Sequence, residues 1–182
     1  MVDAPGGGGE TRDGDGVGGD RTEGDGAEDD DVTDRLLLDA MLGKLATYLR
    51  MCGYDTAYVL DDGPDPGDEA LLERARTEGR TLVTRDEQLA GRADDGVLVT
   101  ARAVTDQLDE FAAAGYAVEL REGPVRCGAC NGPLDAVGPD ESVPAYAPDP
   151  GDRSLWRCRD CGQVFWKGSH WDDVARRIDA GE

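Results

Sequence analysis

The chain has 182 residues, which is enough for one compact domain and a smaller module. Acidic residues outnumber basic ones by 40 to 19, so the formal net charge is −21, and only Lys44 and Lys167 are lysines. Excess acid with little lysine is typical of proteins that work in molar salt, where a Debye length of about 3 Å screens self-repulsion. An ordinary acidic protein is the alternative. This charge argues against a generally basic nucleic-acid-binding surface, so local arginine clusters carry more information.

The sequence contains no pattern typical of membrane insertion or export. It has no apolar run of about 18 residues, so no membrane span is expected. The N-terminus lacks a basic stretch followed by an apolar core, so no signal peptide is expected. Four of the five cysteines form two Cys-x-x-Cys pairs, which favours metal ligands in a reducing compartment over disulfides. We therefore expect a cytoplasmic protein, and one from a salt-rich, halophilic cytoplasm.

Residues 1–34 are expected to form a disordered acidic tail. They hold ten glycines and twelve acidic residues against two arginines. Such a segment cannot bury enough apolar surface to offset the entropy lost on ordering. A solubilising or interaction arm and a tail without a specific role both remain open.

From Arg35 onward, strand and helix patterns alternate. Leu36–Asp39 is predicted to be a strand buried on both faces, and apolar residues then recur at helical spacing up to Gly53. This alternation with short links predicts an α/β domain over residues 35–121, with three layers and a mainly parallel sheet. The further predicted elements are a strand over 55–60, a loop over 61–67, a helix over 68–79, a strand over 80–84, a short helix over 86–89, a strand over 97–100, a helix over 104–112 and a last strand over 116–120.

The two Cys-x-x-Cys pairs predict a zinc ribbon over residues 122–174, followed by a C-terminal tail over 175–182. Four thiolates can surround Zn²⁺ as a tetrahedron, and a closed site of this kind is structural because it leaves no open position for catalysis. Cys52 is expected to be a small core residue. His170, with the neighbouring tryptophans, is expected either to pack on the ribbon or to form a base-stacking surface. The predicted zinc ligands are Cys127, Cys130, Cys158 and Cys161.

Two carboxylates stand just beyond the ends of predicted strands, Asp39 after the first strand and Asp86 after the strand over 80–84. If these strands are neighbours in a parallel sheet, both side chains lie at one crevice. Asp68 opens the intervening helix and can reach the same edge. Clustered carboxylates need a cation, and Mg²⁺ or Mn²⁺ suits an oxygen-rich site that cleaves phosphodiesters. Each of these acids also stands where a helix N-cap is favoured, so capping is the alternative.

Other polar side chains accompany these acids. Thr84 and Arg85 directly precede Asp86 and offer a hydroxyl and a cation suited to a phosphate. Lys44 offers a second cation from the first helix. Metal-dependent phosphodiester chemistry and simple helix capping therefore both remain open from the residues alone.

Four segments of the chain resemble one known family. They read LLLDAMLGKLATYLRMCGYDT from Leu36, DEALLERARTEGRTLVTRDEQLA from Asp68, CGACNGPL from Cys127 and WRCRDCGQVFWKGSHWDDV from Trp156. In this order they resemble the Mut-seven C-terminal RNase family, a PIN-like nuclease domain fused to a zinc ribbon. The distinctive features are the D-x-M-L-G-[KR]-L-A opening, the T-R-D and the G-[ST]-H-W ending.

The resemblance implies a PIN-like fold and an endoribonuclease activity at an acidic cluster that binds Mg²⁺ or Mn²⁺. The catalytic acids that it implies in this sequence are Asp39, Asp68 (or Glu69) and Asp86. PIN domains often use a fourth acid, and no residue here matches it convincingly. The candidates for that fourth position are Asp94, Asp95 and Asp106.

The leading hypothesis is therefore a metal-dependent ribonuclease, a hydrolase whose zinc ribbon helps to hold RNA. The alternative is a non-catalytic RNA- or protein-binding adaptor in RNA processing, built on a degenerate nuclease fold. The side chains expected to contact RNA, besides the tryptophans, are Arg126, Arg153, Arg157, Arg159 and Lys167.

Overall fold

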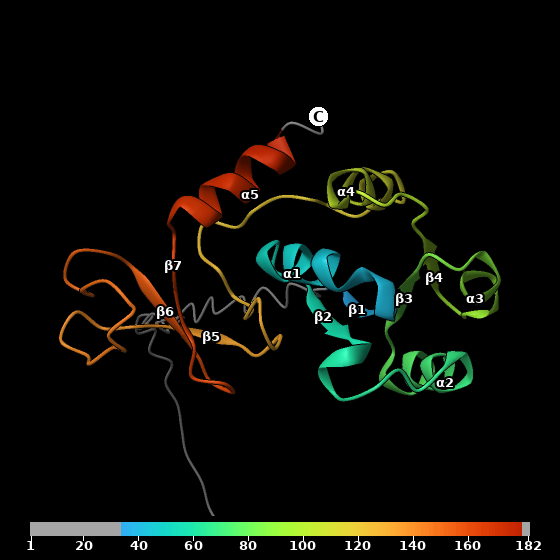
Figure 1. Ribbon diagram of the computed structural model, residues 1–182, viewed down its shortest axis with the longest axis horizontal. Helices are drawn as coiled ribbons and strands as arrows, with labels where there is room; N and C mark the ends of the chain where they lie inside the picture. Colours follow the sequence, from blue (N-terminus) through green and yellow to red (C-terminus); the bar gives the residue numbers. More distant parts are fainter. Residues whose placement is uncertain (1–33, 180–182) are drawn as a thin grey trace, which may run out of the picture. The chain divides into compact units, whose positions relative to one another are not determined.

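The computed structural model describes residues 34–179, apart from the side chains of His170 and Asp179. The expected tail over 1–34 lies outside the described residues, except for Asp34. The first sheet and its helices comprise β1 (Arg35–Leu38), η1 (Ala40–Leu42), α1 (Gly43–Met51), β2 (Asp55–Tyr58), η2 (Val59–Asp61), α2 (Asp68–Glu78), β3 (Thr81–Thr84), α3 (Glu87–Arg92), β4 (Gly96–Leu98) and α4 (Val104–Ala113). The second group comprises β5 (Leu134–Ala136), β6 (Leu155–Cys158), β7 (Val164–Trp166) and α5 (Ser169–Asp179) (Figure 1).

The first sheet has four strands in the order β2-β1-β3-β4, and all of its pairings are parallel. Leu36, Leu37 and Leu38 of the central strand β1 are completely buried, and they point alternately to opposite faces. Leu36 and Leu38 join an apolar cluster with α1 and α4, whereas Leu37 joins a second cluster with α2 and α3. The predicted α/β fold with a mainly parallel sheet is thus confirmed (Figure 1).

The strand predicted over residues 116–120 does not form. In the described part of the chain this segment lies outside any strand. Tyr116, Val118 and Leu120 pack instead against the cluster of α1 and α4, and the ring of Tyr116 stacks on Phe111 with centroids 4.4 Å apart. Alternating apolar residues predict an extended segment with one buried face. Here that face rests on helix side chains, so the prediction of a sheet strand was wrong.

Each of the four strands of the first sheet differs from its predicted limits by one or two residues at an end. β2 ends at Tyr58 because residues 59–61 turn into the short helix η2, and β4 covers Gly96–Leu98 where residues 97–100 were expected. These are shifts of a few residues, and the order of the elements is unchanged.

The second sheet has three short antiparallel strands in the order β5-β6-β7. After β7, helix α5 returns to the α/β part. Val174 is completely buried in the cluster of α1 and α4, and Arg177 Nη1 donates a hydrogen bond to Tyr48 Oη at 3.3 Å. The boundary expected between residues 174 and 175 therefore lies inside α5. No helix among residues 34–179 has both the length and the apolar surface needed to cross a bilayer.

Candidate functional site

Asp39 and Asp86 lie at the ends of two adjacent parallel strands, and a single hydroxyl links them. Asp39 follows β1, and its Oδ2 accepts a hydrogen bond of 2.8 Å from Thr84 Oγ1. Thr84 Oγ1 in turn accepts a hydrogen bond of 3.0 Å from the backbone N–H of Asp86. Because β1 and β3 are direct neighbours, both acids lie at the carboxyl edge of the sheet, where α/β folds build their sites.

Thr84 has a different role from the one expected from the sequence. Its side chain is completely buried at the end of β3, so the hydroxyl is not presented to a phosphate. It fixes the orientation of Asp39 through one bond and the path of the chain into α3 through the other. Thr84 thus positions the carboxylate of Asp39 and the backbone of Asp86.

Both acids also cap the helix that follows them. Asp39 Oδ1 accepts from the N–H of Ala40 at 2.5 Å, at the start of η1. Asp86 Oδ1 accepts from the N–H groups of Gln88 and Leu89 at 2.8 and 3.0 Å, at the start of α3. A carboxylate has about four lone-pair positions on its two oxygens. Capping therefore leaves each acid able to bind a cation as well.

Asp68 does not form a compact three-carboxylate group with the other two acids. It is the exposed first residue of α2, and Gly67, with a φ of 83°, occupies the N-cap position before it. Within residues 34–179, no three carboxylates bring ligand oxygens within 4.8 Å of one another. The structure thus links Asp39 to the Asp86 backbone through Thr84, and the three acids do not form a compact ligand set.

The other candidate acids are engaged elsewhere. Glu69 forms an ion pair with Arg92. Asp94 and Asp95 precede β4, so they lie at the opposite edge of the sheet, where Asp95 accepts from the Thr81 hydroxyl and Asp94 lies 3.3 Å from Arg76. Asp106, in the first turn of α4, follows β4 and is the one fourth-acid candidate beyond a carboxyl end of the sheet.

Cationic side chains accompany the two acids. The side chain of Arg85 lies against the loop after β4, where Nη2 donates to the Thr100 carbonyl at 3.3 Å. Its Nε is buried and has no hydrogen-bond partner among the described residues. Glu110 holds this loop by accepting from the Thr100 hydroxyl and from the backbone, and these bonds lower the pKa of Glu110. Lys44 is exposed in the first turn of α1.

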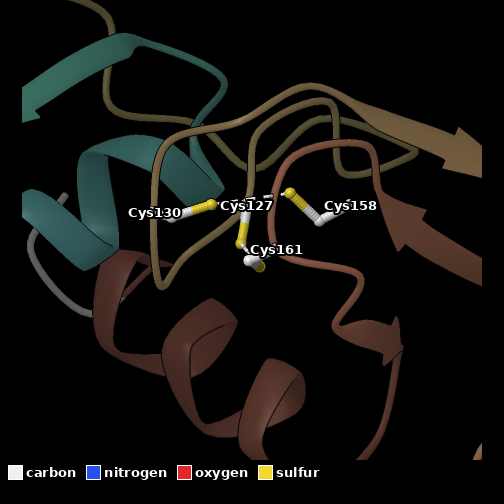
Figure 2. A group of neighbouring side chains, drawn as sticks. All are labelled: Cys127, Cys130, Cys158 and Cys161. Atoms are coloured by element: carbon white, nitrogen blue, oxygen red, sulfur yellow. Dashed lines mark hydrogen bonds between the residues drawn. The ribbon is translucent and has the colours of Figure 1, made fainter.

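The four cysteines of the second sheet form a metal-ligand cluster (Figure 2). Their sulfur atoms all lie within 4.8 Å of one another. The Sγ atoms of Cys127 and Cys161 are 3.7 Å apart, and those of Cys130 and Cys158 are 3.5 Å apart. A zinc tetrahedron with Zn–S bonds of about 2.3 Å needs sulfur separations of about 3.8 Å. The cluster therefore fits a metal such as zinc.

The backbone around the cysteines explains how this cluster forms. Asn131 and Gly162, each directly after the second cysteine of a pair, have positive φ values of 67° and 73°. This conformation turns the backbone so that their N–H groups bond back to the carbonyls of the first cysteines, Cys127 and Cys158. Gly132 is needed for space, because a Cβ there would lie 2.8 Å from the Cys158 sulfur.

The remaining cysteine and the single histidine differ in what the structure shows of them. Cys52 is buried in the cluster of α1 and α4, and burial raises the pKa of its thiol to about 12. Its predicted core role is thus confirmed. The side chain of His170 lies outside the described residues, so its packing or stacking role stays a prediction.

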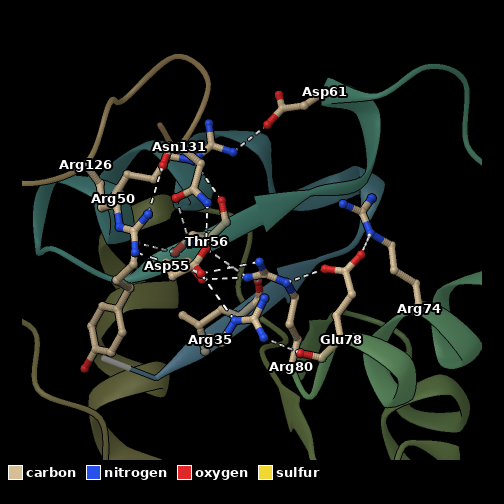
Figure 3. Close-up of polar contacts among 12 residues, drawn as sticks. Arg35, Arg50, Asp55, Thr56, Asp61, Arg74, Glu78, Arg80, Arg126 and Asn131 are labelled. Atoms are coloured by element: carbon tan, nitrogen blue, oxygen red, sulfur yellow. Dashed lines mark hydrogen bonds and ion pairs between the residues drawn. The ribbon is translucent and has the colours of Figure 1, made fainter. Parts of the chain in front are cut away.

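The first cysteine pair is joined to the free edge of β2 (Figure 3). Asn131 Oδ1 accepts from the N–H of Thr56 at 2.9 Å, and Asn131 Nδ2 donates to Asp55 at 2.7 Å. Arg50 Nε donates to the carbonyl of Thr56 at 2.9 Å. Both backbone polar groups of Thr56 are therefore satisfied by side chains, as an edge strand without a neighbour requires.

Besides the Thr56 carbonyl, Arg50 reaches from α1 to three further partners. Its side chain is 3% exposed and pairs with Asp61 at 2.5 Å. Its Nη1 also donates to the carbonyls of Gly128 and Ala129, both at 3.2 Å, within the first cysteine pair. Sequence reasoning missed this contact. The available signal was an arginine next to Leu49 and four residues after Ala46, on the apolar side of a predicted helix.

Asp55 interacts with several arginines, and these interactions predict how the stability of the fold changes with pH. Burial opposes its ionisation, but hydrogen bonds from Arg80 and Asn131 and the charge of Arg126 outweigh burial and hold the pKa of Asp55 below its usual value. A lowered folded-state pKa stabilises the fold above the unfolded value of about 3.9, and this stabilisation is lost as pH falls through the folded pKa.

We therefore expect Asp55→Asn to unfold at a lower urea concentration than the wild type at neutral pH. The difference between the two proteins should shrink steadily as pH falls below about 4. Urea unfolding of both proteins over a pH series measures it, and the comparison cancels any metal release that the two share. A difference that does not vary with pH would contradict the assignment.

The segments described above also match a known protein family. The family model described as the Mut7-C RNAse domain matches residues 34–178, which spans both sheets and most of α5. No curated protein and no solved structure was found to match the chain. The family match covers well over half of the 182 residues and agrees with the resemblance carried by the Asp39, Asp86 and cysteine segments. The chain belongs to the Mut7-C RNAse domain family.

Proposed function

We propose that the protein is a metal-dependent endoribonuclease that cleaves RNA phosphodiester bonds at the edge formed by Asp39 and Asp86. The observation that carries the proposal is the link Asp39–Thr84–Asp86, which holds two carboxylates at the ends of adjacent parallel strands. Helix capping alone would not require the buried Thr84 hydroxyl, which holds the Asp39 carboxylate and the backbone at Asp86 together. Membership of an RNase family supports RNA as the substrate.

The donor set fits Mg²⁺ or Mn²⁺, which prefer carboxylate oxygens and retain several water ligands. In this proposal Asp39 and Asp86 bind the ion directly. Asp68, on the first turn of a helix that begins at the same edge, contacts its water shell. When bound, such an ion supplies an activated water and charge stabilisation at the phosphate. Arg85 and Lys44 offer positive charge to the RNA backbone.

The cysteine cluster has a separate role in this proposal. It binds one structural Zn²⁺ through Cys127, Cys130, Cys158 and Cys161, and the ribbon that it stabilises helps to hold the RNA. The closed set of four thiolates supports a structural metal, because it leaves no coordination position for a reacting water.

Asp39→Asn and Asp86→Asn are each expected to lower Mn²⁺-dependent RNA cleavage by about a hundredfold or more. Each variant removes one charged ligand oxygen from a site whose bound ion contributes several kcal/mol to the transition state. Asn caps helices as well as Asp does, so Asp86→Asn, whose cap uses one oxygen, should keep the wild-type melting temperature. In Asp39→Asn an NH₂ group replaces one of two accepting oxygens, so this variant should melt slightly lower while staying folded. Cleavage of a labelled single-stranded RNA with Mn²⁺ or Mg²⁺ measures the effect.

Asp94→Asn is the matched control for these variants. It makes the same change of charge at an exposed acid on the opposite edge of the sheet, so cleavage should be unchanged. Wild-type cleavage by both Asp39→Asn and Asp86→Asn would overturn the proposed site.

One observation favours a second candidate function, a non-catalytic RNA- or protein-binding adaptor. Within residues 34–179, no third carboxylate completes a compact ligand set with Asp39 and Asp86, whereas nucleases of this kind use three or four acids. An adaptor would bind single-stranded RNA without hydrolysis in Mg²⁺, Mn²⁺ and Co²⁺ alike. The cleavage assay above separates the two functions.

A further inference from the structure

A cavity lined by aromatic rings lies between α1 and the cysteine-bearing sheet. Its volume is about 520 Å³, within the range of small-molecule binding sites. Tyr146, Phe165, Trp166 and Trp171 all line it, and the rings of Tyr146 and Trp166 are 6.4 Å apart and tilted by 32°. Four aromatic residues around one opening offer flat apolar faces of the kind on which nucleic-acid bases stack.

Polar and positive groups stand beside these rings. The side chains of Gln163, Ser169 and Thr47 also line the cavity, and they can donate to or accept from the edges of a base. Lys167 Nζ lies 5.3 Å from the centre of the Trp171 ring. No carboxylate among the described side chains pairs with Lys167, whose Nζ donates to the backbone carbonyl of Glu122. Lys167 thus places one positive charge beside the Trp171 ring, in a chain with a net charge of −21.

The arginines expected to contact RNA from the ribbon are largely used in other contacts. Arg157 pairs with Glu141 at 3.0 Å, and Arg159 pairs with Asp135 at 2.5 Å through two nitrogen atoms. This surface therefore does not offer a set of free arginines to bind the phosphate backbone. Stacking is the remaining strong interaction with single-stranded RNA, and it depends little on charge.

We infer that the cavity binds one unstacked base of single-stranded RNA, with Trp166 and Trp171 as the stacking rings. The inference rests on the proposed function only in taking RNA as the ligand, because binding needs no cleavage. Recognition of this kind tolerates screening by salt, since stacking releases few counterions.

The experiment measures binding of the full chain, without added Mg²⁺ or Mn²⁺, to a labelled single-stranded oligoadenylate by fluorescence polarisation. Trp166→Leu and Trp171→Leu are each expected to weaken binding about tenfold, whereas Trp166→Phe, which keeps a ring, should restore most of it. A ribose–phosphate oligomer of the same length without bases should bind weakly and equally to all these proteins.

Trp156→Leu is the matched control. Trp156 belongs to the same sheet, on β6, and does not line the cavity, so its loss should leave RNA affinity unchanged. Zinc content and melting temperature show whether each variant is folded. In Trp156→Phe, which retains both cavity tryptophans, oligoadenylate should quench the tryptophan fluorescence, and this measurement needs no change in the cavity.

Other outcomes would overturn the inference. The inference fails if folded Trp166→Leu and Trp171→Leu bind oligoadenylate as tightly as the wild type does. It also fails if these variants lose as much affinity for the oligomer without bases as they lose for oligoadenylate. A change in oligomeric state on mutation would show that a second copy of the chain covers the cavity. The proposed nuclease activity is tested separately from this binding. If the wild type does not cleave RNA but binds it more tightly than Trp171→Leu does, only the proposed nuclease activity is contradicted.

Discussion

Cys127→Ser is expected to release the metal and unfold the three-stranded sheet. Three thiolates cannot complete the tetrahedron, and structural zinc contributes about 10–16 kcal/mol in small zinc-binding domains. That contribution is comparable to the whole stability of a typical domain, about 5–15 kcal/mol. The strands β5, β6 and β7 have only three, four and three residues, and so short a sheet buries too little apolar surface to fold alone. We expect about one zinc per chain in the wild type and none in Cys127→Ser.

Elemental analysis of purified protein measures the zinc, and circular dichroism with thermal melting measures the fold. Cys52→Ser is the matched control, because it makes the same substitution at a buried cysteine that is not part of the cluster. It should retain all of its zinc, although burying a hydroxyl will lower its melting temperature. Full zinc occupancy in Cys127→Ser would rule out the four-cysteine site.

Arg50→Met is expected to destabilise the protein by about 3 kcal/mol. Methionine fills much of the same space but removes donors from the carbonyls of Thr56, Gly128 and Ala129 and leaves Asp61 without its partner. Buried acceptors that lose a donor cost about 1–3 kcal/mol each, and a broken buried ion pair costs about 3–5 kcal/mol. Because Asp61 is 33% exposed, water recovers part of that loss.

Urea unfolding at neutral pH measures this change, and competition with a chelator measures whether the metal is held more weakly. Two of the lost bonds fix the loop between Cys127 and Cys130, so we expect zinc to leave Arg50→Met at a lower chelator concentration. Arg159→Met is the control, since its ion pair is exposed and contributes about 1 kcal/mol or less. Stability and zinc retention equal to the wild type would show that the contact is not needed.

The parts of the fold that could be predicted are those whose signal is local. The run of three leucines before Asp39 identified a strand buried on both faces, and the spacing of the cysteines identified their cluster. The segment over 116–120 could not be assigned correctly, because its alternating pattern reports one buried face and does not say what covers it. A sequence shows which side of a segment is apolar, whereas the surface opposite it depends on the whole topology.

In the candidate site, too, some features could be predicted from local sequence and others depended on the topology. That Asp39 and Asp86 lie at one edge followed from their positions after strands, once β1 and β3 proved to be neighbours. The buried bridge through Thr84 could not be foreseen, since a hydroxyl at a strand end can point to solvent or to a neighbour. Asn131 gave no signal of its contact with Thr56, because 75 residues separate the two in the chain.

The closure of the β2 edge by the first cysteine pair has a consequence for how this protein can be divided. A chain cut after residue 121 would retain Arg50 and Thr56 but lose Asn131 and the carbonyls of Gly128 and Ala129. It would therefore present an open strand edge, on which strands of other molecules can add. The α/β half and the half that carries the cysteine cluster are in this sense one folding unit, and the segment of the first cysteine pair protects the β2 edge from self-association.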